Sequence, residues 1–399
     1  MTTNIYLATT TTHLDEHFIF SNSNIFKQKT QLHFQEKYVS SPHCKNTLRT
    51  MSTTHTDLVY MKRCLQIAAA GARNVAPNPM VGAVLVCNGQ IIGEGYHQQY
   101  GQPHAEPNAI ASVQNDELLK NATLYVSLEP CSHYGKTPPC AELIIKKGIP
   151  RVVIGMLDPN PIVAGRGVKM LQDAGIEVSI GVMEKECREL NKRFICYHEK
   201  HRPYIILKWA QSADGFIDNV RENREQPVAI LSSPFTKQLV HKMRAENMAI
   251  LVGTRTAVLD NPGLRTTRWN GNNPLRVVLD RIGKIPDESK LFDGKAQTLV
   301  FTENEKYTQH PNTTICIIDF AANCWQQIMN QLYQMKINSL IVEGGSQVLN
   351  DLIALQLWDE IQVETSPVTL NNGVKAPLFH AIMHKEEHYD GHIMRHYRK

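Results

Sequence analysis

The sequence predicts an α/β protein with two domains, and three observations support this fold class. Short apolar runs typical of buried strands alternate with segments of helical periodicity along most of the chain. This alternation is interrupted once, by a charged segment near residues 184–200, and it resumes after Pro203. The length of 399 residues is enough for two or three domains that each bury a core. Chains of this kind form sheets that are covered by helices.

The first domain is expected to contain a mixed sheet with helices on both faces. Asp57 opens a helix with an acidic first turn, and Asn88-Gly89 is typical of a hairpin turn between two strands. The expected elements are a helix starting at Asp57, strands at 81–86 and 90–96, a helix at 107–113, a strand at 122–128, a helix at 140–147, a strand at 151–155 and a helix at 167–174.

A charged helix is expected to link the two domains. The segment Glu184–Lys200 is rich in Glu, Lys and Arg, which is typical of an exposed helix. After it, Tyr204-Ile-Ile-Leu-Lys-Trp209 has the composition of a buried strand. Further strands are expected at 248–252, 275–279, 298–301, 314–318, 339–342 and 360–364, and helices at 234–243, 324–335 and 347–355. These elements predict a second α/β domain.

Three side chains of the first domain are candidates for a catalytic metal site. His104 would offer an imidazole, and Cys131 and Cys140 two thiolates, which are three of the four ligands of tetrahedral zinc. A fourth position held by water distinguishes a catalytic zinc site from a closed structural one. Glu106 would carry protons, because zinc deaminases pair the metal with a glutamate that is not a ligand. The combination predicts deamination of a nitrogen heterocycle.

Each of these residues has a more ordinary interpretation when it is taken alone. A His-x-Glu at a helix start is usually a solvated turn, and cysteines beside prolines are usually small buried hydrophobes. The order of the residues, next to an expected strand and two expected helices, favours the metal site. The generic deaminase pattern has only two residues between its cysteines, whereas here residues 132–139 intervene. The generic pattern therefore fits only in part.

The longer spacing between the cysteines resembles one enzyme family. The segment Cys131-Ser-His-Tyr-Gly-Lys-Thr-Pro-Pro-Cys140 is similar to the deaminase domain of the bifunctional riboflavin-biosynthesis deaminase/reductase, and the similarity extends from about Asp57 to about Asn372. Other matching segments are 76–84, similar to the family's substrate-pocket entry, 93–97, its following hairpin, and 158–161 with 163–167, its domain-closing segment. The resemblance implies a cytidine-deaminase-like three-layer domain followed by a dihydrofolate-reductase-like domain.

By this resemblance, the first domain binds one zinc ion per chain through His104, Cys131 and Cys140, and Glu106 is the proton carrier. His133 lies between the cysteines, but a water molecule at the fourth position leaves it no ligand role, so it is interpreted as a loop residue. The implied substrate is 2,5-diamino-6-ribosylamino-4(3H)-pyrimidinone 5′-phosphate, whose ring amine is released as ammonia.

The second domain contains one motif suited to a phosphate-containing cofactor. In residues 340–346 a strand runs through Gly344-Gly345 into a helix, where backbone N–H groups and the helix dipole favour an anion. About as often, such a turn reflects only tight packing, and no Gly-x-Gly-x-x-Gly follows the domain's first strand. The resemblance implies NADPH as the cofactor and Glu343 as a substrate contact. It implies cofactor contacts at Gly345, Ser346, Gln347, Val348, Leu349, Asn350 and Asp351.

Further positions of the second domain match the family's pattern individually. The implied cofactor contacts are Ala210, Ile230, Thr256 and Asp260, and the implied substrate contacts are Val228, Arg244, Leu264 and Arg268. Arg265 is the alternative to Arg268, because this segment is one residue longer than the usual pattern. Ile230 stands where many relatives have a tryptophan that stacks on the cofactor. Two arginines suit a substrate phosphate, since the guanidinium group matches its oxygens.

The implied second reaction opens the ribose and transfers hydride from NADPH to its C1′. The proton donor for ring opening stays open among Lys208, Asp260 and Glu343. Two other functions are alternatives, a nucleic-acid deaminase with the same His-x-Glu core and an inactive protein of this fold. The long segment between the cysteines and the second domain argue against the first, and the complete ligand set argues against the second.

Composition limits the partners and the compartment. A formal net charge of +4, without runs of Lys and Arg interleaved with aromatics, gives no support for nucleic-acid binding. No apolar run approaches the length of a membrane span, so no membrane association is expected. Nine cysteines at irregular spacing suit a reducing interior. We expect a cytoplasmic enzyme that assembles as a homo-oligomer and acts on a small molecule.

The N-terminal segment does not fit the family. Residues 1–50 are rich in Ser and Thr, lack the apolar core of a signal peptide and show no clear period. They are predicted to be a disordered extension or an over-reading upstream of a start at Met51. The expected organisation is this extension, a zinc-dependent deaminase domain at 51–182, a linker helix at 183–202 and an NADPH-dependent reductase domain at 203–399.

Overall fold

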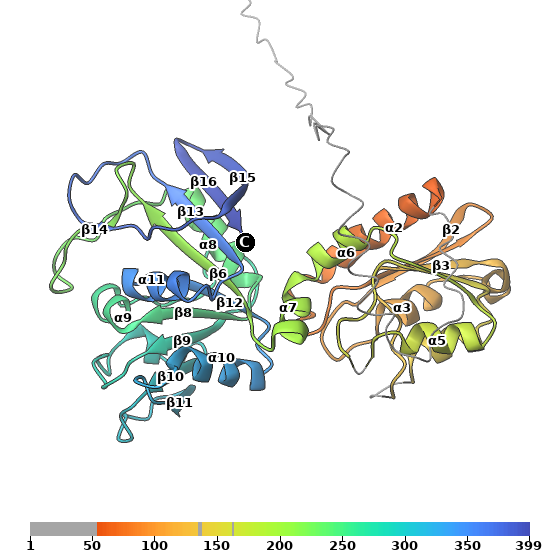
Figure 1. The fold of residues 1–399 in the computed structure, drawn as a ribbon, viewed down its shortest axis with the longest axis horizontal. Coiled ribbons are helices and arrows are strands. Elements are labelled where there is room, and N and C mark those ends of the chain that lie inside the picture. Colours follow the sequence, from red (N-terminus) through yellow and green to blue (C-terminus); the bar gives the residue numbers. More distant parts are fainter. Residues whose placement is uncertain (1–53, 135–137, 162) are drawn as a thin grey trace, which may run out of the picture. The chain divides into compact units, whose positions relative to one another are not determined.

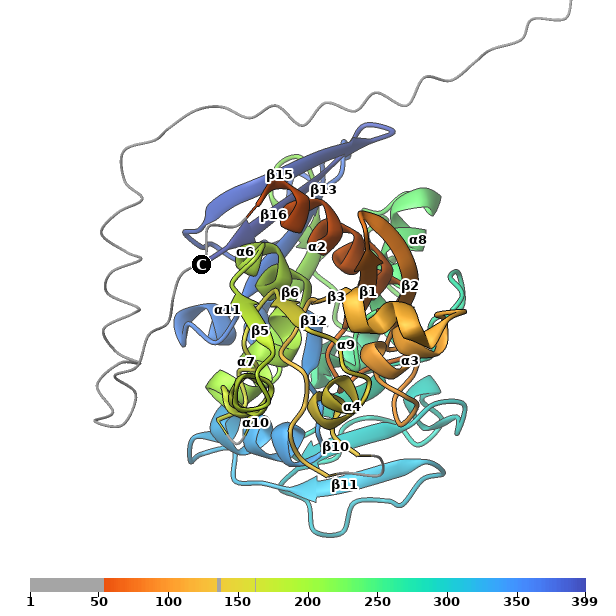
Figure 2. The same cartoon turned by 90° about the vertical axis from the view of Figure 1, so that its right-hand side faces the viewer.

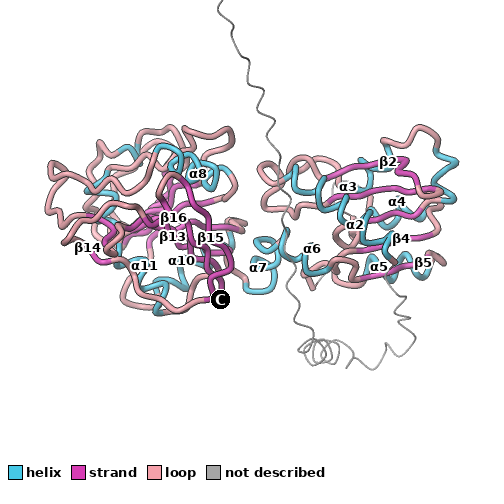
Figure 3. Tube along the Cα trace, turned by 90° about the horizontal axis from the view of Figure 1, so that it is seen from above, coloured by secondary structure: helices cyan, strands magenta, loops and turns pink. Residues whose placement is uncertain are grey.

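The structure, a computed structural model, describes residues 54–134, 138–161 and 163–399. The predicted N-terminal extension, residues 1–50, lies outside the described residues. Within them the strands form a five-stranded sheet, a nine-stranded sheet and a two-stranded ribbon (Figure 1). Figure 3 distinguishes the strands from the helices that pack on them. The predicted α/β fold class is confirmed.

The sheet of the first domain is mixed, as expected. Its strands are β1 (Gly82–Cys87), β2 (Gln90–Tyr96), β3 (Thr123–Val126), β4 (Arg151–Ile154) and β5 (Glu177–Ile180), in the spatial order β2-β1-β3-β4-β5. β1 pairs antiparallel with β2 and β3, whereas β3, β4 and β5 run parallel. The helices are α2 (His55–Ala68), α3 (Ala105–Ala111), α4 (Cys140–Lys146) and α5 (Arg166–Asp173), with 3-10 turns at Ala69–Gly71 and Asp116–Asn121.

Two glycines place α2 and α3 on opposite faces of this sheet. A Cβ atom on Gly82 would lie 2.1 Å from the carbonyl oxygen of Cys64 in α2. A Cβ atom on Gly95 would lie 2.2 Å from the backbone nitrogen of Ala109 in α3. Gly95 pairs with Ala83, and Ala83 and Gly82 face opposite sides because they are neighbours in one strand. α4 packs against α3 and α5, so helices cover both faces, as predicted (Figure 2).

The prediction of one continuous linker helix is wrong, because the structure divides it in two. α6 (Glu184–Leu190) and α7 (Lys192–Lys200) meet at Asn191, whose φ of −103° and ψ of 20° depart from helical geometry. The Asn191 side chain accepts a hydrogen bond from the Met80 N–H at 2.8 Å and donates one to the Met80 carbonyl at 2.9 Å. The charge pattern of this segment carries no sign of that contact, since its partner lies far away in the sequence.

The second domain is built on the nine-stranded sheet. Its strands are β6 (Tyr204–Gln211), β8 (Ala249–Gly253), β9 (Leu275–Leu279), β10 (Thr298–Thr302), β11 (Thr313–Ile317), β12 (Ser339–Gly344), β13 (Glu360–Thr365), β15 (Ile382–Tyr389) and β16 (His392–Arg398), in the order β11-β10-β9-β8-β12-β6-β13-β16-β15. The strands from β11 to β13 in that order run parallel, and β16 and β15 are antiparallel additions. The carboxyl ends of β12, β6 and β13 therefore meet at one edge.

The remaining elements complete the second domain. They are the ribbon of β7 (Phe216–Asp218) with β14 (Val374–Lys375), the helices α8 (Pro234–Ala245), α9 (Thr254–Asp260), α10 (Cys324–Gln334) and α11 (Ser346–Ala354), and a 3-10 turn at Lys290–Phe292. The strands and helices that were predicted here are confirmed with small shifts at their ends. The elements β5, β7, β14, α9 and the β15–β16 hairpin were not predicted. Among the described residues, no helix combines the length and the apolar character that crossing a membrane requires.

A buried carboxylate anchors the start of α2. Asp57 is 3% exposed and accepts hydrogen bonds from Thr54 Oγ1 at 2.8 Å, from Tyr125 Oη at 2.9 Å and from Arg151 Nη1 at 3.1 Å. Burial by itself would raise the pKa of Asp57, but the hydrogen bonds from Arg151, Thr54 and Tyr125 outweigh it and lower the pKa to about 2.

Replacing Asp57 by Ala should lower the free energy of unfolding by about 2 to 3 kcal/mol at pH 7, because lowering the pKa of this carboxyl group to about 2 on folding contributes about that much stability. The folded-state pKa lies below the unfolded one, so this stabilisation is complete above about pH 4 and declines as the pH falls toward 2. Urea unfolding of both proteins between pH 7 and pH 3 measures the difference. Glu177→Ala, which removes the more exposed partner of Arg151, is the control and should cost under about 1 kcal/mol. A difference independent of pH would contradict this account.

Candidate functional site

The first part of the site comes from the start of α3. His104 is the N-cap residue of this helix, with extended backbone angles, and Glu106 lies in the first turn. Glu106 is 3% exposed, which is unusual for a glutamate. The close approach of α3 to β2 at Gly95 buries this turn against the sheet. The helix start therefore places an imidazole and a buried carboxyl group two residues apart.

The two cysteines lie at the ends of one loop between β3 and α4. Cys131 follows the carboxyl end of β3, and Cys140 is the first residue of α4 after Pro139. The Cys140 N–H donates to Cys131 Sγ at 3.3 Å, and the Ala141 N–H donates to the Cys131 carbonyl at 3.2 Å. These two hydrogen bonds hold Cys131 at the amino-terminal end of α4, beside Cys140.

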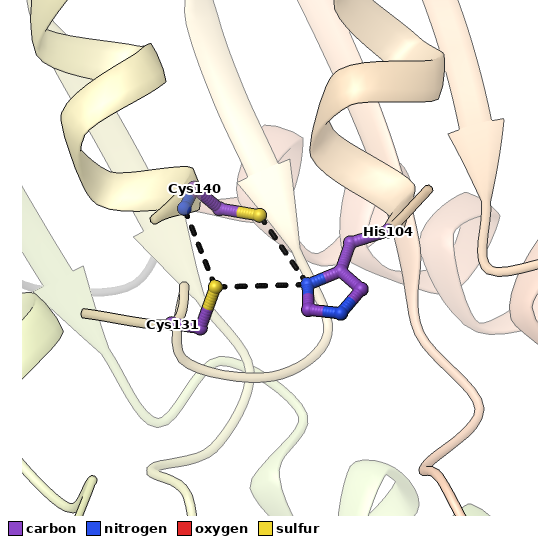
Figure 4. A group of neighbouring side chains, drawn as sticks. All are labelled: His104, Cys131 and Cys140. Atoms are coloured by element: carbon purple, nitrogen blue, oxygen red, sulfur yellow. Dashed lines mark hydrogen bonds between the residues drawn. The ribbon is translucent and has the colours of Figure 1, made fainter. Parts of the chain in front are cut away.

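The three predicted ligands meet in space (Figure 4). His104 Nδ1 lies 3.6 Å from Cys131 Sγ and 3.4 Å from Cys140 Sγ, and the three ligand atoms all lie within 4.8 Å of one another. Zn–N and Zn–S bonds of about 2.0 and 2.3 Å at tetrahedral angles would separate nitrogen and sulfur by about 3.5 Å. The two nitrogen–sulfur distances therefore match those around a zinc ion. His133 is exposed in the loop, in agreement with its interpretation as a loop residue.

The protonation of these groups suits metal binding and proton transfer. The hydrogen bond between the two cysteines, followed by that from His104, lowers the pKa of Cys131, whereas the same hydrogen bond and burial raise the pKa of Cys140, so Cys131 is the sulfur that loses its proton first. Burial raises the pKa of Glu106 to about 7. A carboxyl group with a pKa near neutral takes up and releases protons with similar ease.

His97 and Asn78 lie beside the ligands, although no individual role was predicted for either. The His97 ring is 5.5 Å from the His104 ring, centroid to centroid, and it is 2% exposed. Its Nδ1–H donates to the Pro103 carbonyl at 3.0 Å, which leaves Nε2 to accept from the Asn78 amide at 3.2 Å. Burial lowers the pKa of His97, so this imidazole stays neutral and holds the orientation of Asn78.

In the second domain, the structure brings Arg244, Glu343 and Lys208 together. Arg244 Nη2 donates to Glu343 Oε2 at 2.6 Å, and its Nε donates to Oε1 at 3.3 Å. Lys208 is 8% exposed and follows Leu207, which pairs with Val342, the residue before Glu343. Burial would raise the pKa of Glu343, but the positive charges of Arg244 and Lys208 outweigh it and lower the pKa. Arg244 is therefore not an ordinary surface charge.

The other predicted substrate contacts have different surroundings. Leu264 is buried in the core with a positive φ of 48°. Arg265 forms an ion pair with Asp293 at 3.9 Å and offers its carbonyl to Arg244 at 3.2 Å, whereas the Arg268 side chain is exposed. Val228 and Ile230, on the segment before α8, are 52% and 73% exposed. Such exposure of large apolar side chains is compatible with a ligand contact but does not require one.

The turn from β12 into α11 provides the predicted cofactor contacts. Gly345 has a positive φ of 79° and offers no side chain to cap the helix, so the first N–H groups of α11 are available to an anion. Thr256 lies next to Gly345, because its Oγ1 would be 3.4 Å from a Cβ atom at Gly345. Val348 and Leu349 are buried in the core, whereas Ser346 and Asn350 line a cleft of about 1010 Å³. Any cofactor contact at Val348 and Leu349 would thus use the backbone.

The ends of β6, β13 and α9 carry the remaining side chains. Ala210 pairs in register with Glu364, which is fully buried and was not predicted. Glu364 accepts a hydrogen bond from the Ser232 hydroxyl at 2.6 Å and lies 2.9 Å from His392 Nδ1. Asp260, at the end of α9, forms an ion pair with Arg221. No local sequence pattern marks Glu364, because its partners come from three separate segments.

Comparison with known proteins identifies relatives over both domains. Residues 54–156 match the cytidine and deoxycytidylate deaminase zinc-binding region, and residues 203–382 match the RibD C-terminal domain. The chain is 40% identical over 323 residues to riboflavin biosynthesis protein RibD of Aquifex aeolicus, covering 80% of this chain and 89% of that protein. It is 37% identical over 336 residues to that of Escherichia coli strain K12, covering 80% and 90%.

Solved structures of similar proteins have the same two-domain fold. The diaminohydroxyphosphoribosylaminopyrimidine deaminase/5-amino-6-(5-phosphoribosylamino)uracil reductase of Thermotoga maritima is 37% identical, with a TM-score of 0.78 over 86% of this chain and 99% of that chain. Acinetobacter baumannii RibD is 30% identical, with a TM-score of 0.78 over 86% and 98%. These matches confirm the predicted arrangement of a cytidine-deaminase-like domain followed by a reductase domain.

Replacing Cys131 by Ala should reduce the zinc content of the purified chain from about one ion to well below one, because two protein ligands hold zinc far less tightly than three. Elemental analysis of the dialysed protein measures the change. Cys316→Ala, at a partly exposed cysteine of β11, is the matched control and should keep its zinc. Equal zinc in both variants would contradict the ligand assignment.

Proposed function

This chain belongs to the family of riboflavin biosynthesis protein RibD, and we propose that its first domain deaminates the substrate at a zinc ion held by His104, Cys131 and Cys140. RibD enzymes combine a zinc-dependent deaminase with an NADPH-dependent reductase. The observation that carries the proposal is the convergence of three ligand atoms within 4.8 Å of one another, next to the buried Glu106.

Glu106 is the proton carrier in this proposal. Zinc, when bound, lowers the pKa of a coordinated water molecule to about 7 and so supplies a nucleophile near neutral pH. Glu106 takes protons from the attacking water and delivers one to the ring nitrogen and one to the amino group, which leaves as ammonia. Its pKa of about 7, raised by burial, supports both the uptake and the release. His97 and Asn78 orient the substrate ring beside the ligands.

The second domain reduces the deaminated product, with NADPH as the source of the hydride for C1′ of the ribose. We place the substrate near Glu343, whose carboxylate Arg244 holds in a fixed orientation. Asp260 is paired with Arg221 and Glu343 with Arg244, which leaves Lys208 as the stronger candidate for proton transfer during ring opening. Arg268 is favoured over Arg265 as a phosphate contact, because the guanidinium group of Arg265 is paired with Asp293.

The cofactor is proposed to lie against the start of α11. Gly345 lets a phosphate approach the backbone, and the first N–H groups of α11 favour its negative charge. Thr256 lies beside Gly345, while Ser346 and Asn350 extend the contact into the cleft. The proposed cofactor contacts also include Ala210 at the end of β6, the exposed Ile230, and Gln347 and Asp351 on α11. Val348 and Leu349 contribute their backbone.

The proposed substrate contacts of this domain include Val228 and Leu264.

The finer assignments follow from family membership. We propose 2,5-diamino-6-ribosylamino-4(3H)-pyrimidinone 5′-phosphate as the substrate, which agrees with the name of the Thermotoga maritima relative. The domain boundaries are proposed at 51–182, 183–202 and 203–399. A cytoplasmic location is proposed because the ligand thiols need a reducing compartment. A homo-oligomer stays a prediction that light scattering of the purified protein would test.

Glu106→Gln should retain zinc and lose deamination by about 10² to 10⁴-fold, the usual contribution of general acid–base catalysis. Ammonia release with the ribosylaminopyrimidine phosphate measures deamination, and NADPH oxidation with substrate deaminated beforehand measures reduction. The second rate should be unchanged. Glu117→Gln, at an exposed carboxylate of the same domain, is the control. Loss of both activities in Glu106→Gln would contradict separate sites.

Glu343→Gln should impair reduction and spare deamination, because the substitution removes the negative charge beside Lys208 and Arg244. A fall of at least about tenfold in kcat/KM of the reductase is expected, equal to about 1.4 kcal/mol of transition-state stabilisation. Arg244→Met should act in the same direction, whereas Lys242→Met, an exposed cation on the same helix, should not. Reductase kinetics like those of the unmodified chain in both site variants would refute this assignment.

A further inference from the structure

We propose that Glu129 is a positioning residue of the zinc site, which holds Cys131 in place by joining the backbone just before it to Asp158 and to residues 165–168. The inference rests on the proposed function, because it takes Cys131 as a zinc ligand. Glu129 lies two residues before Cys131 but does not point its carboxylate at the ligands. It is 3% exposed, and its carboxylate is directed at the backbone of another segment.

Four backbone N–H groups donate to this one carboxylate. Oε2 accepts from Asp158 at 3.2 Å and from Gly165 at 3.0 Å. Oε1 accepts from Gly167 at 2.9 Å and from Val168 at 3.2 Å. The last two belong to the first turn of α5, where N–H groups have no partner within the helix and favour a negative charge. Hydrogen bonds to an ionised acceptor are stronger than neutral ones, so this contact joins the two segments firmly.

A second observation shows how closely the segments are packed. A Cβ atom on Gly167 would lie 2.0 Å from the carbonyl oxygen of Pro130, the residue between Glu129 and Cys131. The first turn of α5 therefore rests directly on the backbone that leads to the ligand. On the other side, the Cys140 and Ala141 N–H groups bond Cys131 itself. Cys131 is thus held between α4 and the Glu129 contact with α5.

This arrangement preorganises one of three zinc ligands. The thiolate of Cys131 must stay within bonding distance of a metal shared with His104 and Cys140. Residues that orient a ligand commonly change metal affinity by about 10 to 100-fold when they are replaced. Glu129 should therefore affect zinc affinity more than it affects the chemistry of the loaded site.

The test is Glu129→Gln in the full-length chain. The amide keeps the length of the side chain but has one acceptor oxygen and turns an NH₂ group toward N–H donors. Zinc affinity, measured by competition with a chromogenic chelator, should fall by about 10 to 100-fold. Deaminase kcat should recover toward that of the unmodified chain when zinc is in excess, and reductase activity on deaminated substrate should not change. Glu117→Gln is the matched control and should bind zinc as the unmodified chain does.

Glu129→Asp is the second variant, because it keeps the charge and withdraws the carboxylate by one methylene group. It should also bind zinc more weakly. Zinc affinity like that of the unmodified chain in either folded variant would overturn the proposal, even if the thermal unfolding midpoint fell. Loss of folding in both variants would also overturn it, since Glu129 would then serve the fold and not the zinc site. An unmodified chain that binds no zinc would refute the proposed deaminase site itself, a result visible without any Glu129 variant.

Discussion

The main constraint on the first domain is that one imidazole nitrogen and two sulfur atoms must lie close enough together to share one zinc ion. The three ligands come from two helix starts and the loop after a strand. Each backbone segment must therefore be held independently before the metal can be shared. The sheet between α2 and α3 supplies this support, since the glycines of β1 and β2 let both helices approach the strands closely. Burial of Glu106 in the same helix start follows from that approach.

The two domains use polar side chains in buried surroundings in different ways. In the first, burial of Glu106 raises its pKa toward neutrality, and no cation among the described residues donates a hydrogen bond to it. In the second, Arg244 and Lys208 lower the pKa of Glu343, which keeps this carboxylate charged. A proton carrier needs the first environment, and a fixed negative charge next to a substrate needs the second. Parallel strands place Lys208, Ala210 and Glu343 near one edge of the sheet, where ligands of α/β proteins commonly bind.

Most of the fold could be predicted because its elements have clear periodicity. The strands of the second domain, such as β8 and β10, are continuous apolar runs, which is how buried parallel strands appear in a sequence. The edge strand β15 could not be predicted, since most of its residues are polar and exposed. The break at Asn191 was missed because a contact with Met80 decides it. Glu364 and Glu129 were missed for the same reason, as their partners are remote in the chain.

The amino-acid sequence alone predicted the candidate zinc ligands, the candidate proton carrier and the order of the two domains, because residue types at a given spacing are visible in it and resemble those of one family. The tertiary structure alone decided whether the ligand atoms converge, which carboxyl groups are buried beside cations and which are not, and which backbone supports Cys131. These properties arise from distances between segments far apart in the chain, and spacing along the chain carries no information about such distances.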